Sequence, residues 1–143
     1  MSEVISKLMD KNDKAACDYA WELGSESAES DKYLSFIPEF AGLLSHQNSY
    51  VRTRGFMMIC NQARWAEDGQ IEAVFDQMAV LLHDKKPTVV RQCLKALHEV
   101  AIYRPELSER MLQAIGEIDC SLYKDSMSPL IEKDIKALKS LLE

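Results

Sequence analysis

A repeat with a period of 38 residues is the feature that most restricts how this chain can fold. Two copies align without a gap, and most of the matching positions are apolar. In the first copy these are Ala41, Leu43, Leu44, Val51, Ile59, Ala63 and Trp65, and in the second Ala79, Leu81, Leu82, Val89, Leu97, Ala101 and Tyr103. Such a period is typical of proteins that stack one supersecondary unit on the next, because a single unit cannot bury its apolar face alone.

Each copy contains two helical patterns separated by a polar turn, at residues 45–49 in the first copy and 83–87 in the second. Asn48 or Ser49 is suited to cap the helix after the first turn, since a short polar side chain accepts a hydrogen bond from a free amide there. Pro87 or Thr88 marks the start of the equivalent helix. The pattern therefore predicts an all-α chain of helix pairs.

Weaker copies extend the repeat to both ends of the chain. A last unit matches the second copy at an offset of 41 residues, which places Ile131 opposite Val90 and Leu138 opposite Leu97. The first unit is expected to hold a short helix at 4–9, a longer one at 14–24, and the loosest link of the chain at 24–30. The approximate units are residues 2–29, 31–66, 69–104 and 105–143, which form one domain.

The Leu-Leu, polar-turn, Val-Arg order resembles that of HEAT repeats. It occurs from Leu43-Leu44 to Val51-Arg52 and again from Leu81-Leu82 to Val90-Arg91. The small residue usual after Val-Arg is Gly55 in one copy but Cys93 or Leu94 in the next, which leaves the HEAT and armadillo types both open. Residues 50–139 also resemble small bacterial HEAT-repeat proteins. The resemblance implies a right-handed αα-solenoid of about four helix pairs, with the second helix of each pair on the concave face.

Candidate partner-binding residues lie on these second helices, away from the predicted apolar stripe of Val51, Gly55, Met58, Ile59 and Gln62. They are Arg54, Met57, Asn61 and Trp65 in one unit, Arg91, Gln92, Lys95 and Glu99 in the next, and Lys133 and Lys136 in the last. Guanidinium groups bind carboxylates in a fork and aromatic rings supply buried area, so such a surface suits an extended acidic peptide or another protein partner. The predicted function is a non-catalytic adaptor or scaffold.

Two simpler interpretations of the same residues stay open. Charged helix faces are often only solvated surface. Trp65 and Tyr103 occupy equivalent positions of the repeat, which favours a place in the core between units over a place in a binding groove.

Binding to nucleic acid is the main alternative function. A family of alkylpurine DNA glycosylases is built from HEAT-like repeats with basic residues, tryptophans and an aspartate on the concave face. The similar residues here are Arg52, Arg54, Arg64, Trp65 and Asp68, although their spacing gives no residue-by-residue match. The net charge of −6 opposes contact with phosphates, and the most basic part, residues 51–110, has only nine Lys or Arg against eight Asp or Glu.

Signals for catalysis are weak throughout the sequence. It contains no Gly-x-Gly phosphate loop, and His46 and His83 fall in predicted turns. His98-Glu99 resembles one of the His-Glu dipeptides by which the HEAT-repeat enzyme deoxyhypusine hydroxylase binds iron, but one dipeptide cannot complete such a site. We therefore predict no catalytic residue, no metal and no cofactor.

The remaining expectations concern the cysteines, the location and self-association. Cys17, Cys60, Cys93 and Cys120 are far apart in apolar patterns, and we expect them to be reduced and buried. The sequence shows no secretory signal and no apolar run long enough to cross a bilayer, so we expect a cytoplasmic protein.

A third functional hypothesis is a homodimer through the terminal repeat. Its contact would use Ile135, Leu138, Leu141 and Leu142.

Overall fold

The computed structural model describes residues 2–143, and these residues form eight α-helices and five short 3-10 helices without any strand. The α-helices are α1 (Glu3–Leu8), α2 (Asp13–Ser27), α3 (Ile37–Gly42), α4 (Ser49–Asn61), α5 (Glu72–Val80), α6 (Pro87–Tyr103), α7 (Ser108–Gly116) and α8 (Ser128–Leu142). The 3-10 helices are Leu34–Phe36, Leu43–Ser45, Leu81–His83, Pro105–Leu107 and Cys120–Leu122. The all-α class predicted from the sequence is confirmed.

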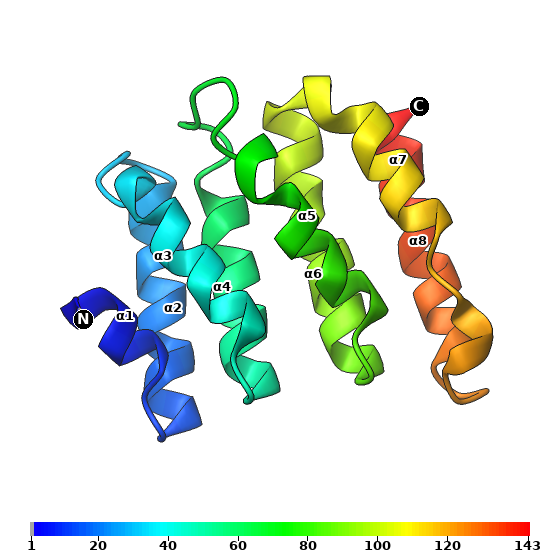
Figure 1. The fold of residues 1–143 in the computed structure, drawn as a ribbon, viewed down its shortest axis with the longest axis horizontal. Helices are drawn as coiled ribbons and strands as arrows, with labels where there is room; N and C mark the ends of the chain where they lie inside the picture. The colour runs from blue at the N-terminus through cyan, green and yellow to red at the C-terminus, as the bar shows by residue number, and fades with distance from the viewer. Residues whose placement is uncertain (1) are drawn as a thin grey trace.

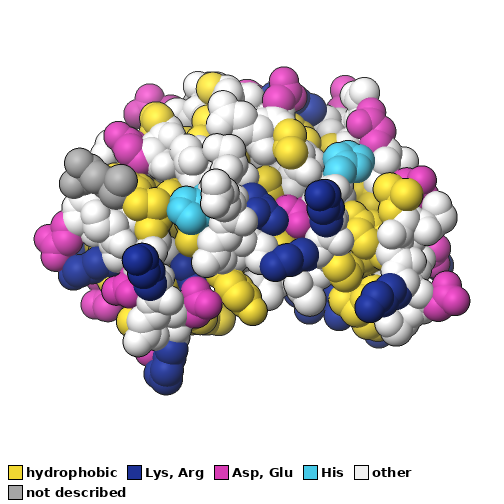
Figure 2. Space-filling model, turned by 60° about the horizontal axis from the view of Figure 1, so that its bottom comes forward, with side chains coloured by type: hydrophobic (Ala, Val, Ile, Leu, Met, Phe, Trp, Pro, Cys, Tyr) yellow, Lys and Arg dark blue, Asp and Glu magenta, His cyan; other side chains and the backbone are white. Residues whose placement is uncertain are grey.

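The helices are arranged in two layers (Figure 1). Helices α1, α3, α5 and α7 lie in the layer nearer the viewer, and α2, α4, α6 and α8 lie behind them and are called the even layer here. Within the even layer α2 packs on α4, α4 on α6, and α6 on α8. Figure 2 shows that the molecule is arched, with a hollow along its lower margin where apolar and basic side chains gather.

The core is continuous from the first helix to the last. On α4 the predicted stripe is buried, with Val51 and Met58 at 1% exposure and Ile59 and Gln62 at 0%. The equivalent position to Ile59 on α6 is Leu97, which is also buried. Each such aliphatic side chain stabilises the fold by roughly 1.5–3 kcal/mol through removal of its surface from water.

Helices α4 and α6 begin where the turn residues predicted, and α8 also begins with a proline in its first turn. The side chain of Asn48 accepts a hydrogen bond from the amide of Tyr50 and caps α4. Pro87 is the first residue of α6, and Pro129 is the second residue of α8. Proline suits these places because the first amides of a helix have no partner within it.

The link predicted at residues 24–30 is wrong in its first half, because α2 continues through Gly24 to Ser27. Ser27 is 1% exposed, and its hydroxyl accepts a hydrogen bond from Nε2 of Gln62 at 3.0 Å. The carbonyl oxygen of Ser27 accepts a second one from Nε1 of Trp65 at 2.6 Å. These contacts from α4 and the turn after it hold the end of α2 in helical form, which local propensity does not reveal.

Three hydrogen bonds from side chains to backbone carbonyls join residues that are 38 positions apart in the sequence, which is the period of the repeat. Trp65 reaches Ser27, Arg104 reaches Ala66, and Arg110 reaches Glu72, each across 38 residues. The interpretation of Trp65 as a packing residue is therefore supported by its partly buried ring and its bond to α2. Tyr103 is 40% exposed and lies against the guanidinium of Arg64, 4.8 Å from the ring centre.

Gly55 allows α3 and α4 to approach closely. A Cβ atom at this position would stand 2.8 Å from Cβ of Leu43 and 2.8 Å from the carbonyl oxygen of Phe40. Both contacts are too short for a real Cβ, and one of them is to backbone. The small residue of the repeat pattern therefore has a packing role in this copy.

Candidate functional site

An open groove of about 920 Å³ lies on the even layer, and we call it the α4 groove. It is lined by α2 and α6 on its two sides and by α4, the helix between them. The lining of α4 runs from Tyr50 to Asn61, almost the whole length of the helix. The groove is therefore shaped by the packing of three successive even-layer helices.

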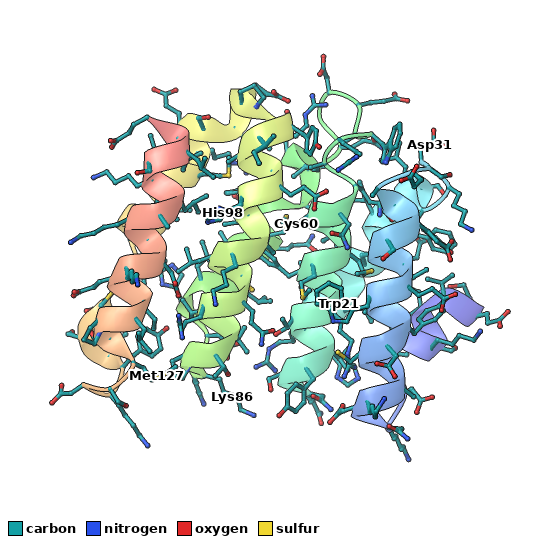
Figure 3. The ribbon with its side chains drawn as sticks, turned by 180° about the vertical axis from the view of Figure 1, so that it is seen from behind. Trp21, Asp31, Cys60, Lys86, His98 and Met127 are labelled. Atoms are coloured by element: carbon teal, nitrogen blue, oxygen red, sulfur yellow. The ribbon has the colours of Figure 1, made fainter. Side chains whose placement is uncertain are left out.

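Aromatic and apolar side chains dominate the exposed lining. Trp21 on α2 is 68% exposed, and Figure 3 shows it between α2 and α4. Tyr50 at the start of α4 is 61% exposed, and Met57 is partly buried between them. Large exposed aromatic rings beside a groove are the residues that most often anchor protein partners.

Trp21 was missed by the prediction from the sequence. The available signal is its position on α2, whose buried stripe is formed by Ala16, Ala20 and Leu23. Trp21 follows Ala20 directly, so it projects about 100° away from that stripe. A tryptophan off the buried face of an amphipathic helix indicates a contact surface.

Five of the ten candidate residues come together in this groove. They are Arg54, Met57, Asn61, Gln92 and Lys95. The other five, Trp65, Arg91, Glu99, Lys133 and Lys136, are not part of its lining. These five come from α4 and α6, while the groove itself extends toward α2 rather than along all three predicted helices.

Arg54 does not have the open position expected for it. The residue is 6% exposed, its Nη1 donates to the carbonyl oxygen of Leu8 at 2.9 Å, and its Nη2 lies 3.1 Å from Oδ1 of Asp13. Helices α1 and α2 pack on α4 and enclose the guanidinium. Its donors therefore join the first helices to α4 instead of gripping a partner's carboxylate.

Arg91 likewise makes a contact within the protein. Its Nε donates to Oδ2 of Asp134 at 2.7 Å, and Asp134 is only 8% exposed. This hydrogen bond raises the pKa of Arg91. Arg91 connects α6 to α8, and the expectation that it faces a partner is replaced by this role.

Trp65, Glu99 and Arg64 form a partly buried cluster near the C-terminal ends of α4 and α6. Glu99 lies 4.0 Å from the guanidinium of Arg64, which also donates to the carbonyl oxygen of Ala28. Burial raises the pKa of Glu99, and the charge of Arg64 opposes this rise. Arg64 thus connects the C-terminal end of α2 to Glu99 on α6.

Lys95, Lys133 and Lys136 remain exposed on α6 and α8. Within residues 2–143 none of the three has a carboxylate within 4.0 Å. On α8 the two lysines lie on the side opposite buried Ile131 and Leu138. These lysines are therefore available to a ligand on this part of the surface.

The residues that resemble the DNA glycosylase inventory make contacts within the protein, although the side chain of Asp68 is fully exposed. Arg52 pairs with Asp84 at 2.9 Å, and Asp68 pairs with Arg104 at 3.0 Å. Arg64 and Trp65 make the contacts described above. The structure thus gives each of these side chains a partner in the protein itself.

The four cysteines differ in how deeply they are buried, whereas the sequence predicted burial for all of them. Cys60 and Cys93 are buried as predicted, and burial raises the pKa of both thiols. Cys17 is exposed and lines the α4 groove, so its predicted place in the core is wrong. Cys120 is partly buried, which is also less than predicted.

Other predicted features can be located as well. Leu138 is fully buried and Ile135 and Leu142 are partly buried, so of the proposed dimer contact only Leu141, at 47%, is well exposed.

Over the described part of the chain no three His, Cys, Asp or Glu side chains are grouped as metal ligands are. No helix in residues 2–143 is both long enough and apolar enough to span a membrane. Comparisons with protein families, with curated proteins and with solved structures give no match.

Proposed function

We propose that this protein is a non-catalytic interaction module that holds a segment of a partner protein in the α4 groove. The observation that carries the proposal is the exposure of Trp21 and Tyr50 beside an open groove of about 920 Å³. Leaving two large rings in water forfeits burial energy that a partner restores, and such rings dominate the binding energy of many interfaces. Adaptor or scaffold is the class of function that this surface supports best.

The proposed architecture is a HEAT-like, right-handed αα-solenoid of four helix pairs, with units near residues 2–29, 31–66, 69–104 and 105–143. The alternation of helices between the two layers supports it (Figure 1). So do the side-chain bonds that recur across 38 residues. In such a solenoid one layer lines a continuous concave surface, which repeat proteins use to bind partners.

A protein partner fits this groove better than a nucleic acid does. Phosphate binding depends on dense, available positive charge, and the net charge of the chain is −6. Arg52, Arg54 and Arg64 are each bonded to groups of the protein itself. What the groove offers instead is apolar and aromatic surface with lysines at its margins, a composition suited to an amphipathic polypeptide.

The test is a comparison of three forms of the protein as baits in native lysate, with bound proteins identified by mass spectrometry. Trp21→Glu places a charge in the groove, and Val80→Glu places the same charge on α5, where Val80 is 66% exposed. We expect a partner that the wild type and Val80→Glu retain and that Trp21→Glu loses. Equal capture by all three would contradict the proposal.

Two further measurements on the purified protein test the alternative functions, which are nucleic-acid binding and self-association. Tight, salt-dependent binding of DNA in a gel shift at physiological salt would favour the nucleic-acid hypothesis. Light scattering that shows a dimer, together with capture of the same chain alone, would favour self-association. We expect neither result.

A further inference from the structure

The α4 groove follows α2 and α4 over most of their length. The lining extends from Asp13 to Ser25 on α2 and from Tyr50 to Asn61 on α4. At a rise of 1.5 Å per residue these stretches are about 17 Å long. A ligand that lies along α4 therefore has about 17 Å of lining to contact.

The width of the groove suits a helix. Neighbouring packed helices are about 8–10 Å apart, so α2 and α6, on either side of α4, are separated by about twice that distance. A helix with its side chains has a diameter of about 10–12 Å. One further helix can therefore rest on α4 and touch both α2 and α6.

The backbone of the occupant gives a second reason for a helix. The walls of the groove are helices whose own amides and carbonyls are already bonded within them, so they offer no row of backbone partners like a sheet edge. An extended peptide in this groove would have to leave many backbone groups without partners, which is costly on burial. A helix satisfies its backbone internally.

The surface of α2 presents side chains at helical spacing. Lys14, Cys17, Trp21 and Ser25 all line the groove and follow one another at three or four residues. Such a row forms a ridge that packs between side-chain rows of a second helix. The complementary helix has apolar residues at i, i+3 or i+4, and i+7, which meet Trp21 and Met57.

The charged side chains of the groove lining indicate which polar residues the bound helix carries. The lining contains the cations Lys14, Arg54 and Lys95 and one carboxylate, Asp13, which pairs with Arg54. Lys14 stands on the α2 side, where it contacts only the exposed Asp18, and Lys95 stands on the α6 side. The charge of Lys14 is thus balanced by Asp18, and among the described lining residues Lys95 is the cation that has no carboxylate within 4.0 Å.

We infer that the segment bound in the α4 groove is a short amphipathic α-helix of about three turns, whose apolar stripe is flanked by Asp or Glu on the side that faces α6. Its apolar stripe contacts Trp21, Met57 and Ala96, and its carboxylates face Lys95. This inference rests on the proposed function and specifies the class of its partner.

The probe for the test is a random-peptide display library, selected on the wild-type protein after removal of peptides that also bind Trp21→Glu. We expect enriched sequences with apolar residues at helical spacing, acidic residues beside them and no internal proline. Synthetic copies should gain helical circular dichroism on binding. A proline in the middle of such a peptide should weaken it about a hundredfold, since proline costs a helix about 3 kcal/mol.

Variants of the protein complete the test. Lys95→Glu should weaken the selected peptides about tenfold, in line with the effect of a charge reversal at an interface margin, and Val80→Glu should leave their affinity unchanged. Trp21-dependent peptides that tolerate proline, or whose apolar residues alternate, would overturn the helix but leave the proposed function standing. Selection of basic peptides would overturn the charge assignment. If no Trp21-dependent peptide is enriched, both the inference and the proposed function fail.

Discussion

The guanidinium of Arg54 on α4 reaches the carbonyl oxygen of Leu8, the last residue of α1, at 2.9 Å. A carbonyl at the end of a helix has no partner within that helix, so the arginine supplies the missing donor. The same side chain pairs with Asp13 at the start of α2. One residue of the central helix thus holds the N-terminal helix pair in place beneath the α4 groove.

Replacement of Arg54 with alanine should destabilise the fold by about 2 kcal/mol, because a buried carbonyl loses its partner and a packed side chain is removed. Asp13→Ala should cost less than about 1 kcal/mol, since the Asp13 side chain is 49% exposed. Urea denaturation of both variants measures the difference. Equal losses would show that Arg54 acts only through its surface ion pair.

Gly55→Ala should destabilise the protein by about 1–3 kcal/mol, since the added Cβ meets Leu43 and the backbone of Phe40 at 2.8 Å. Gly42→Ala is the matched control. A Cβ atom added at Gly42 would have no described heavy atom within 4 Å, apart from its chain neighbours and the backbone of its own helix. The control should gain up to about 1 kcal/mol from the lower entropy of the unfolded chain. A loss at Gly42 as large as that at Gly55 would contradict the close approach of α3 and α4.

Leu97→Ala should lower the free energy of unfolding by roughly 2–5 kcal/mol, as expected for a leucine removed from a packed core. Leu97 is 1% exposed, whereas Leu122, in the loop between α7 and α8, is 76% exposed. Leu122→Ala is therefore expected to change stability by less than about 0.5 kcal/mol. Calorimetry of the two variants checks which face of α6 is buried. A stability change near zero for Leu97→Ala would show that the buried face of α6 is misassigned.

The buried thiols should make the protein less stable at alkaline pH. Burial raises the pKa of Cys60 and of Cys93 in the folded state, whereas in the unfolded chain both titrate near the ordinary value of about 8.5. Below about pH 8 both states keep the protons and the thiols have no effect on stability. Above about pH 9 only the unfolded state loses them, so stability falls by about 1.4 kcal/mol per pH unit for each thiol.

The measurement is the slope of unfolding free energy between about pH 9 and pH 10.5 for the wild type and for Cys93→Ala. Removal of one buried thiol should make the slope shallower by about 1.4 kcal/mol per pH unit. Cys17→Ala, at an exposed position, serves as the control with an unchanged slope. Identical slopes for all three proteins would mean that Cys93 titrates normally in the fold.

The helices were predictable because their signals are local and repeated. Apolar spacing, Asn48 as a cap and Pro87 in a first turn indicate where α4 and α6 begin, and the structure agrees. The end of α2 was not predictable in the same way. Its last turn depends on bonds to Gln62 and Trp65, which lie more than 30 residues away in the sequence.

The groove was only half predictable from a helical wheel. A wheel separates buried from open sides of one helix, and it placed Met57, Asn61 and Lys95 correctly on the open side. It assigns the same openness to Arg54, although α1 and α2 cover that part of α4. Trp21 was missed because the first unit matches the repeat least well, so its equivalent face had no template.

Cys17 provides the most direct measurement of the central claim, that the α4 groove is where a partner binds. It lines the groove and is exposed, whereas Cys60 and Cys93 are buried. The measurement is the rate of alkylation of Cys17 by N-ethylmaleimide, followed by mass spectrometry, with and without the captured partner or a selected peptide. At a ligand concentration ten times its Kd, the rate should fall about tenfold, in proportion to the free fraction. The rate at Cys120, between α7 and α8, should not change. An unchanged rate at Cys17 under saturating ligand would contradict the account.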